Sequence, residues 1–499
     1  MEFFHNFPFF SIILSMVCAT ISSILPARYA RRLTFGLVSA VFFLSVGTLL
    51  YVLRTGESFV FLMGHFPAPW GNEIRAGVLE AVMAITFSVV MFLSLLGGQS
   101  MLREQIEESR QNLYCIMVDL LMAALLAEVY TNDLFTAYVF VEIMTLTACA
   151  LIMIRQNGHT LVAAVRYMIM NLVGSGLILI GITLLYGITG HLLMENIQRS
   201  IALLVQTGDY HLPLTVAIAL LCVGVAIKSA LFPFHTWLPD AYGYSTPASS
   251  AMLSSLVSKV YIFLLIKIFY RVIGLDSVLT GTARIFDVLF IFGLLGIVLG
   301  SILAIREHDI RRMIAYSSVA QIGYIYAAFS LGTTAGFVAA IFQMISHAFS
   351  KSMLFIACSG LSEASGGSKR FRDLRSSAYR NPWAGVAFAL GAMSMVGIPL
   401  LGGFIVKYYI SSAAISYGGT HMILLVGALA VSTVLNTIYF LRTVMNIYNP
   451  HPAVAYFPPY KAPLSFKIAM GVFALANIVL GVYSGPIISA ITSGLSMFA

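Results

Sequence analysis

The sequence predicts an all-α protein that crosses a membrane many times, and three observations lead to this fold class. Hydrophobic residues make up 59% of the 499 residues and charged residues only 10%, whereas soluble proteins average about 45–50% and about 25%. The apolar residues form continuous runs about as long as the roughly 20 residues that a membrane-spanning helix needs. Because these runs do not alternate between apolar and polar residues, a transmembrane β-barrel is excluded. So few charged side chains also exclude a soluble globular protein.

Fourteen apolar runs are expected to form membrane-spanning helices. In chain order, they cover residues 7–25, 33–54, 76–98, 113–131, 132–155, 161–189, 212–235, 246–271, 284–305, 311–331, 333–362, 382–416, 419–447 and 465–490. The first run has neither a basic head nor a small-residue cleavage site, so we interpret it as a retained helix and not as a signal peptide. With the N-terminus outside, most Lys and Arg residues of the connections fall on the cytoplasmic face, which agrees with an even number of spans.

Five ionisable residues lie deep inside these apolar runs, namely Glu142, Lys228, Lys259, Lys351 and Lys407. A Lys at the centre of a bilayer costs about 2.5–3.5 kcal/mol on insertion scales, so such residues face a bundle interior or water and mark ion or proton pathways. A carboxylate beside a buried ammonium favours the charged form, and separating the two favours release of the proton. The alternative interpretation is a set of structural ion pairs that fix helix register.

Further charged residues lie in other apolar runs. Glu80, Asp119, Glu128 and Asp287 add carboxylates in further runs. Lys267 lies near a helix end, and we expect its long side chain to extend to the membrane interface.

Two of the runs contain helix breakers next to a Lys. Pro233 and Pro239 follow Lys228, and Pro399 precedes Lys407. A Pro removes a backbone donor and kinks or breaks a helix, and irregular backbone at membrane depth is tolerated only where it is buried in protein or lines water. Interrupted helices at corresponding places in two halves point to the ion site of a transporter with inverted repeats.

The two breaks predict a division of the chain into repeats. Each repeat has five helices, and the second is inverted because five crossings reverse the direction of the chain. We therefore expect helices 7 and 12, counted in chain order, to be broken. The predicted units are an N-terminal three-helix segment at 1–112, a first five-helix repeat at 113–271, a second at 272–447 and a C-terminal helix segment at 448–499.

Cysteine spacing and charge distribution exclude several other functions. The five Cys residues lie inside apolar runs and form no C-x-x-C motif, so we expect no disulfide framework, zinc site or iron–sulfur cluster. The net charge of +8 is spread without a block of like charges, which speaks against nucleic acid as a partner. We expect no cofactor and no metal in this chain, and the lipid bilayer as its surroundings.

The segment KSALFPFHTWLPDAY at 228–242 is the most distinctive motif, and STPASSAMLSSLVSKVYIF follows it at 245–263. Together they resemble the central motif of the proton-translocating antiporter-like membrane subunits. That family includes the large membrane subunits of respiratory complex I, the D-type subunit of the Mrp-type Na+/H+ antiporters and counterparts in membrane-bound hydrogenases. Further matches, within a resemblance that covers roughly residues 55–415, are MGHFPAPWGNEIRAGVL (63–79), DLFTAYVFVEIMTL (133–146), IREHDIRRMIAYSSVAQIGY (305–324), ISHAFSKSMLFIACSG (345–360) and GIPLLGGFIVKYY (397–409).

The resemblance implies roles for three residues of the first half. Glu142 matches the family's acid on helix 5, and Lys228 matches the Lys on broken helix 7, so together they resemble the pair that switches the pump. Lys259 matches the helix 8 position, Lys or His in relatives, that hands the proton to the central axis.

The resemblance also assigns roles in the second half of the chain. His347 and Lys351 match relay positions on helix 11, and Lys407 matches the group at the exit side of helix 12. His235 lies inside the central motif, where a relay role and a structural hydrogen bond at the helix break both stay open.

The resemblance and the buried charges together predict a proton-translocating membrane subunit of a multisubunit, redox-driven ion pump, such as a membrane-bound hydrogenase or a complex I-like oxidoreductase. The implied partners are other membrane subunits, including related antiporter-like subunits, and a peripheral redox module, in the cell (inner) membrane of a prokaryote. We do not expect the chain to be catalytic alone, because nothing in it matches a flavin, iron–sulfur or nicotinamide site. Two alternatives stay open: the D-type subunit of a multisubunit Na+/H+ antiporter, and a stand-alone secondary solute transporter.

Overall fold

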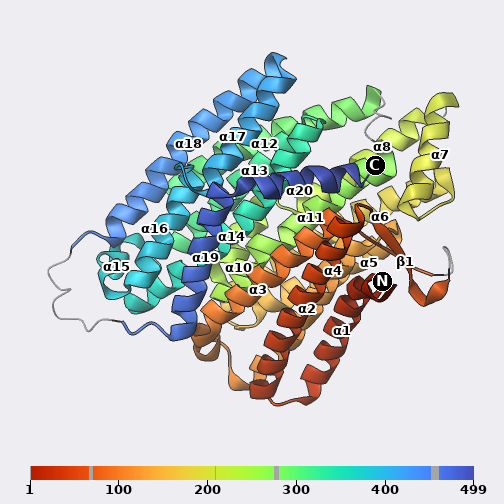
Figure 1. Cartoon of the computed structure of the whole chain (residues 1–499). Coiled ribbons are helices and arrows are strands. Elements are labelled where there is room, and N and C mark those ends of the chain that lie inside the picture. Colours follow the sequence, from red (N-terminus) through yellow and green to blue (C-terminus); the bar gives the residue numbers. More distant parts are fainter. Residues whose placement is uncertain (1, 67–70, 208–209, 275–279, 451–459, 499) are drawn as a thin grey trace.

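The computed structural model shows a bundle of long helices (Figure 1). It describes residues 2–66, 71–207, 210–274, 280–450 and 460–498, so part of the predicted 63–79 motif, residues 67–70, lies outside the described residues. The long helices are α1 (Phe7–Ile24), α2 (Ala27–Thr55), α3 (Val78–Gln105), α4 (Glu108–Tyr130), α5 (Leu134–Met153), α6 (Gly158–Thr189), α8 (His211–Lys228), α12 (Thr280–Arg306), α13 (Ile310–Phe329), α14 (Thr334–Ala364), α18 (Gly419–Ile447) and α19 (Leu464–Val482).

Shorter helices connect or extend the long ones. They are η1 (Glu2–Asn6), η2 (Met63–His65), α7 (Met194–Thr207), η3 (Phe234–Trp237), α9 (Leu238–Tyr244), α10 (Pro247–Met252), η4 (Leu253–Val257), α11 (Ser258–Lys267), η5 (Ile268–Ile273), η7 (Phe371–Leu374), α15 (Ser377–Arg380), α16 (Pro382–Val396), α17 (Gly402–Tyr417) and α20 (Ser484–Ser496). The segments α10, η4, α11 and η5 follow one another without a gap and form one composite helix, Pro247–Ile273.

Twelve helices of the described residues are long and apolar enough to cross a membrane, so the chain is a multi-pass membrane protein. The two predicted spans outside this set also have helices in the structure. The run 311–331 corresponds to α13, whose 20 residues include many hydroxyl and charged side chains. The run 382–416 is divided between α16 and α17, and each half alone is too short for a complete crossing.

Both interruptions predicted from Pro and Gly are present. Helix α8 ends at Lys228, and the chain continues through η3 and α9 before the composite helix begins. Helix α16 ends at Val396, Gly397 adopts a left-handed φ of 90°, and α17 begins at Gly402. A Gly in this conformation ends a helix without steric cost.

A short antiparallel β-sheet, which the sequence analysis did not predict, lies at the end of the bundle that also holds α7 and both chain termini (Figure 1). It joins β1 (Phe59–Leu62) to β2 (Glu73–Ala76), with Phe59 opposite Ala76 and Leu62 opposite Glu73. In β2 the apolar residues Ile74 and Ala76 are buried and alternate with partly exposed polar ones. That period of two is typical of a half-buried strand, but it lasts too few residues to stand out in a sequence of long helices.

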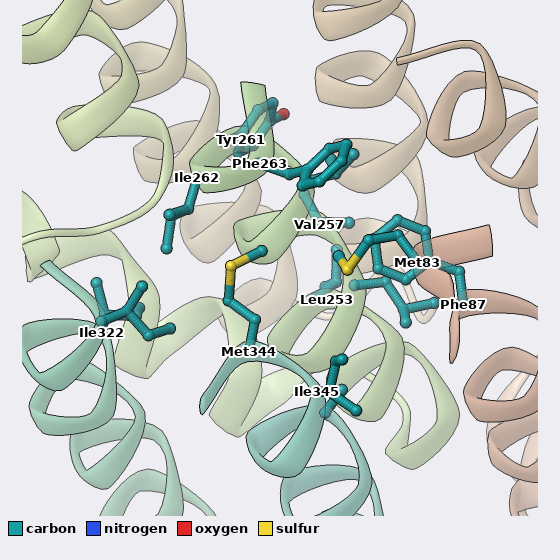
Figure 2. Close-up of a cluster of buried hydrophobic side chains, with 14 of the residues drawn as sticks. Met83, Phe87, Leu253, Val257, Tyr261, Ile262, Phe263, Ile322, Met344 and Ile345 are labelled. Carbon is teal, nitrogen blue, oxygen red and sulfur yellow. The ribbon is translucent and has the colours of Figure 1, made fainter. Parts of the chain in front are cut away.

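The composite helix Pro247–Ile273 is the buried axis of the bundle. Every residue in its most apolar 18-residue window is buried inside the chain. Figure 2 shows Leu253 and Val257 from this helix packed near Phe87 of α3 and Met344 of α14. Elements from both predicted repeats and from the N-terminal segment thus meet around the helix that contains Lys259.

The interrupted helix pair α16 and α17 depends on a close backbone contact at Gly403. A Cβ atom at this position would lie 1.8 Å from the carbonyl oxygen of Ser394. We therefore expect Gly403→Ala to reduce the free energy of unfolding by about 1–3 kcal/mol, the usual cost of overpacking. The measurement is the thermal unfolding midpoint of the purified protein in detergent. Gly427→Ala in α18 is the matched control, because a Cβ there meets no atom within 4 Å, and equal midpoints for the two variants would contradict the packing argument.

Candidate functional site

The first part of the site is an ion pair between α5 and the broken end of α8. Lys228 Nζ lies 3.4 Å from Glu142 Oε1, and the exposed fractions of the two side chains are 0% and 28%. Glu142 also accepts a hydrogen bond from Ser175 of α6. Lys228 is the last residue of α8, where unpaired carbonyl groups favour a positive charge. The pair thus has one member inside the bundle and one facing its surface.

Two hydroxyl groups extend this pair toward the buried axis. Lys228 Nζ donates to Thr145 Oγ1 at 2.8 Å, and Thr145 Oγ1 lies 3.3 Å from the hydroxyl oxygen of Tyr261. The ammonium also lies 5.5 Å from the centroid of the Tyr261 ring, within the range of a cation–π interaction. A chain of hydrogen-bonding groups therefore leads from Lys228 into α11.

The second part of the site lies on the central helices and contains Lys259, His347 and Lys351, all of them buried. Lys259 Nζ donates to the backbone oxygen of Ser254 at 2.5 Å and to Ser258 Oγ at 3.1 Å. In the chain, Lys259 comes two residues after the end of the π-helical turn η4. Such turns occur frequently at functional sites.

His347 is the third buried ionisable group of this part. It lies within range of electrostatic interaction with both Lys259 and Lys351. Neither of its ring nitrogens has a hydrogen-bond partner among the described residues. Lys351 Nζ donates to the backbone oxygen of Ile314 at 2.9 Å and to Ser317 Oγ. Because a buried polar group without a partner costs free energy, the unpaired imidazole indicates a place for water or for a transferred proton.

The third part of the site lies at the broken helix of the second half. Lys407 of α17 donates from Nζ to the backbone oxygen of Val396 at 2.6 Å and to Thr433 Oγ1 of α18 at 2.8 Å. Val396 is the last residue of α16. Lys407 and Lys228 therefore each place an ammonium at the C-terminal end of an interrupted helix, where the helix dipole favours a cation.

His235 lies apart from these groups. Its ring stacks on Phe232 with centroids 5.1 Å apart, and its Nδ1 atom is buried without a hydrogen-bond partner in the described part of the chain. No hydrogen bond between the described residues joins it to another predicted relay residue. The structure thus brings Glu142 and Lys228 into contact and places His347 near Lys259 and Lys351, but it leaves His235 outside this arrangement.

The expectation that Lys267 extends to the membrane interface is wrong. Lys267 is completely buried and does not extend to the membrane interface, because its Nζ donates to the backbone oxygens of Glu128 at 2.5 Å and Thr131 at 2.9 Å. Arg271, the last residue of the apolar run 246–271, is also buried and pairs with Glu80. Both residues stand near the end of an apolar run, where the sequence alone does not distinguish a buried side chain from one that reaches the interface.

A polar cavity of about 390 Å³ lies beside the break in α8 and is lined by residues of α6, α9 and α13. Asp240 of α9 lines it and pairs with both Arg166 of α6 and Arg312 of α13. Lys369, in the connection after α14, donates to the nearby backbone oxygen of Gly243 at 3.0 Å. Burial and the neighbouring Arg311 lower the pKa of Lys369 to about 7.

The sequence of this chain matches the model of a known protein family. The model described as "NADH:quinone oxidoreductase/Mrp antiporter, TM" matches residues 131–435, more than half of the chain and the part that contains all seven predicted site residues. The chain belongs to this family. Its resemblance to antiporter-like membrane subunits, inferred above from the motifs, is thereby confirmed.

Curated relatives of this NADH:quinone oxidoreductase/Mrp antiporter family member come from both branches of the family name. NADH-quinone oxidoreductase subunit N of Desulforudis audaxviator is 32% identical over 469 residues, which cover 91% of each chain. The D-type subunit of the Na(+)/H(+) antiporter of Alkalihalophilus pseudofirmus is 27% identical over 355 residues, which cover 70% of this chain and 69% of the relative.

Two solved structures have the same fold as this family member. A chain of the membrane-bound sulfane sulfur reductase, an archaeal respiratory membrane complex, superimposes with a TM-score of 0.88 at 25% identity and covers 100% of this chain and 98% of its own. A chain of the Mrp complex from Dietzia sp. gives a TM-score of 0.88 at 23% identity, covering 99% and 97%. These relatives are subunits of multisubunit membrane complexes. Among the described residues, no cluster of His, Cys, Asp or Glu could hold a metal ion.

Proposed function

We propose that this chain is the proton-translocating membrane subunit of a redox-driven, complex I-type pump in the cell membrane of a prokaryote. The observation that supports this most directly is the contact between Glu142 and a completely buried Lys228 at the end of a broken helix. Insertion of such a Lys is costly, and the cost is accounted for if the residue binds and releases protons. A curated relative that covers 91% of this chain, a NADH-quinone oxidoreductase subunit N, agrees with the redox-driven type.

In the proposed mechanism, the ion pair acts as a switch. While Glu142 lies against Lys228, the carboxylate stabilises the protonated amine. When the two separate, the buried ammonium loses this stabilisation and passes its proton toward Lys259, His347 and Lys351. Lys407, at the second broken helix, then delivers a proton to the exit side. His235 has a structural role at the helix break in this scheme, because its ring is stacked on Phe232.

The proposed architecture places this switch in a symmetric frame of fourteen spans. Residues 113–271 and 272–447 form two inverted five-helix repeats, flanked by 1–112 and 448–499. Support comes from the two interrupted helices, each of which places a Lys at the C-terminal end of a helix segment. In the proposed complex, related antiporter-like subunits lie beside this chain and a peripheral module supplies the redox reaction.

A second candidate function is that of the D-type subunit in a multisubunit Na+/H+ antiporter. The similarity to the Na(+)/H(+) antiporter relative and the common fold with a chain of the Mrp complex favour it. The buried relay would be the same in both functions. The difference is the driving force, because exchange with Na+ would replace the redox reaction.

Purification of the native complex through a tag on this chain distinguishes the two functions. A redox-driven pump predicts iron in the purified complex and proton uptake into vesicles that needs an electron donor and acceptor but no Na+ gradient. An antiporter predicts no associated redox metal and proton movement on addition of Na+ alone. A complex without redox metal that still moves protons against Na+ would overturn the redox-driven proposal in favour of the second one.

A further inference from the structure

A second group of buried charges lies outside the predicted relay, at the end of the bundle that holds the β-sheet. It contains Glu128 near the end of α4, Lys267 and Arg271 on the composite helix, and Glu80 at the start of α3. Lys267 lies within range of electrostatic interaction with Glu128, Arg271 and Glu80. With the N-terminus outside, this end of the bundle faces the outside of the cell.

Glu128 is the least satisfied member of this group. Both of its carboxylate oxygens are buried, and neither has a hydrogen-bond partner among the described residues. The hydroxyl of Tyr130 and the Nε and Nη1 atoms of Arg271 are also buried without partners there. Several unpaired polar atoms in one region are the setting in which proteins hold internal water. The group thus has the polar atoms that a proton path needs. A purely structural ion pair does not account for these unpaired atoms.

The inner side of this group faces the series of hydrogen-bonding groups that begins at the switching pair. Lys228 Nζ, Thr145 Oγ1 and the Tyr261 hydroxyl form a continuous series with separations of 2.8 and 3.3 Å. Tyr261 lies within range of electrostatic interaction with both Glu142 and Glu128. A proton that leaves Lys228 through these hydroxyl groups is therefore brought within electrostatic range of the Glu128 carboxylate, and internal water between the unpaired polar atoms would complete the path.

The outer side of the group reaches the surface beneath the C-terminal helix α20. Arg75 of β2 lies 3.2 Å from Glu195 of α7, whose side chain is partly exposed. Arg75 also donates to the backbone oxygen of Met497 at 2.5 Å. The ring of Phe498 lies 4.0 Å from the guanidinium carbon of Arg271. The residues that follow α20 thus cover the buried group and separate it from the charged surface around Arg75.

We propose that Glu128 is a proton-binding site on an exit branch, which leads from Lys228 through Thr145 and Tyr261 to Glu128 and Lys267 and then to the outer face beneath α20. In this step the Lys228 ammonium loses one proton, each hydroxyl accepts one and passes one on, and the Glu128 carboxylate becomes a carboxylic acid. Release of that proton to the outside restores the carboxylate beside the Lys267 ammonium. The inference rests on the proposed proton-translocating function and adds a second exit besides Lys407.

The alternative is that Lys267 and Glu128 only fix the end of α4, since Lys267 donates to the last carbonyl groups of that helix. Asp119 provides a matched control on the same helix. It is also completely buried, it also has one carboxylate oxygen without a partner, and its other oxygen accepts from Ser22 of α1 at 2.9 Å. Asp119 faces α1 and has no contact with the proposed branch in the described structure.

The test compares Glu128→Gln with Asp119→Asn in the purified complex, reconstituted in vesicles with a pH-sensitive dye. General acid–base groups contribute about 10²- to 10⁴-fold to the steps that they serve. Because the Lys407 exit remains, we expect Glu128→Gln to reduce proton transport by about tenfold with normal assembly. Asp119→Asn should stay within about twofold of the unmodified complex, since its carboxylate serves no step in this scheme. Equal effects of the two variants, or unchanged transport in Glu128→Gln, would overturn the exit branch.

Infrared difference spectra on proton loading provide a second readout that does not depend on turnover. A protonated carboxyl band should be present in the unmodified complex and in Asp119→Asn but missing in Glu128→Gln. If Glu128→Gln does not assemble, Glu128→Asp replaces it and must shift this band; an unshifted band overturns the inference. Lys228→Ala distinguishes failure of the proposed function from failure of the exit branch. Full transport in Lys228→Ala would reject the proposed function itself. Loss of transport in Lys228→Ala together with normal transport in Glu128→Gln would reject only the exit branch.

Discussion

Replacing Lys228 by Ala should abolish proton transport while leaving expression and assembly of the complex largely intact. The side chain is completely buried and is the link between Glu142 and the hydroxyl groups of Thr145 and Tyr261. Without the amine, a proton would have to cross this part of the bundle with no group to bind it. Each 1.36 kcal/mol added to a barrier slows a step tenfold, so a penalty of a few kcal/mol implies a loss of at least about 100-fold. The measurement is dye quenching in vesicles that contain the purified complex.

Lys228→Arg separates a relay from a structural charge. Arg keeps the positive charge beside Glu142 but does not release its proton at any accessible pH. If Lys228 only fixes helix register through its ion pair, the Arg variant should transport protons better than the Ala variant. If Lys228 carries the proton, both variants should fail. Native gel electrophoresis of each variant checks assembly, and retained pumping in Lys228→Ala vesicles with an intact complex would count decisively against the relay.

The sequence predicted the parts of the site that contain an energetically costly residue, namely an ionisable side chain inside an apolar run or a Pro inside a helix. Lys228 and Lys407 stand in apolar runs beside Pro and Gly residues, so a charge within an apolar run and a broken helix beside it could both be predicted from the order of the residues alone. The contact of Glu142 with Lys228 confirms the predicted pair as a contact. The role of each residue in proton transfer stays a prediction.

The site residues that the sequence did not predict are of types that carry no energetic cost in a membrane helix. Thr145, Ser175 and Thr433 complete the hydrogen bonds of Glu142, Lys228 and Lys407, yet hydroxyl residues are common in membrane helices and nothing in the sequence distinguishes these three from the others. Burial of a Lys or Arg near a helix end depends on which neighbouring elements cover it, and that is a property of tertiary packing.

The burial of Arg271 is an example of this dependence on tertiary packing. Arg271 lies at the end of an apolar run, where a basic residue normally reaches the interface. In the fold, Glu80 from α3 and Phe498 from the segment after α20 cover it. These residues are far apart in sequence, so only the three-dimensional arrangement reveals the buried group at the outer end.

Glu142→Gln should reduce proton transport by about tenfold. Gln keeps the shape of Glu and a side-chain oxygen that can accept from Ser175, so the fold of α5 and α6 should be preserved. It removes the negative charge and leaves the Lys228 ammonium buried without a counterion. Breaking a buried ion pair from one side costs about 3–5 kcal/mol, but Glu142 is partly exposed and solvent screens such pairs strongly. A remaining penalty of about 1.4 kcal/mol corresponds to the tenfold loss.

Assembly and transport must be measured together in the Glu142→Gln variant, because the structural interpretation predicts a different pattern. If the pair only fixes helix register, the variant should give less assembled complex, and each assembled complex should pump normally. If the pair is the switch, the yield should be normal and the rate per complex should fall. Ser175→Ala is the matched control: it removes one hydrogen bond to Glu142 but keeps the charge beside Lys228, so it should retain most of the transport. A Ser175→Ala variant as impaired as Glu142→Gln would show that the position of the carboxylate, and not its charge alone, controls the proton on Lys228.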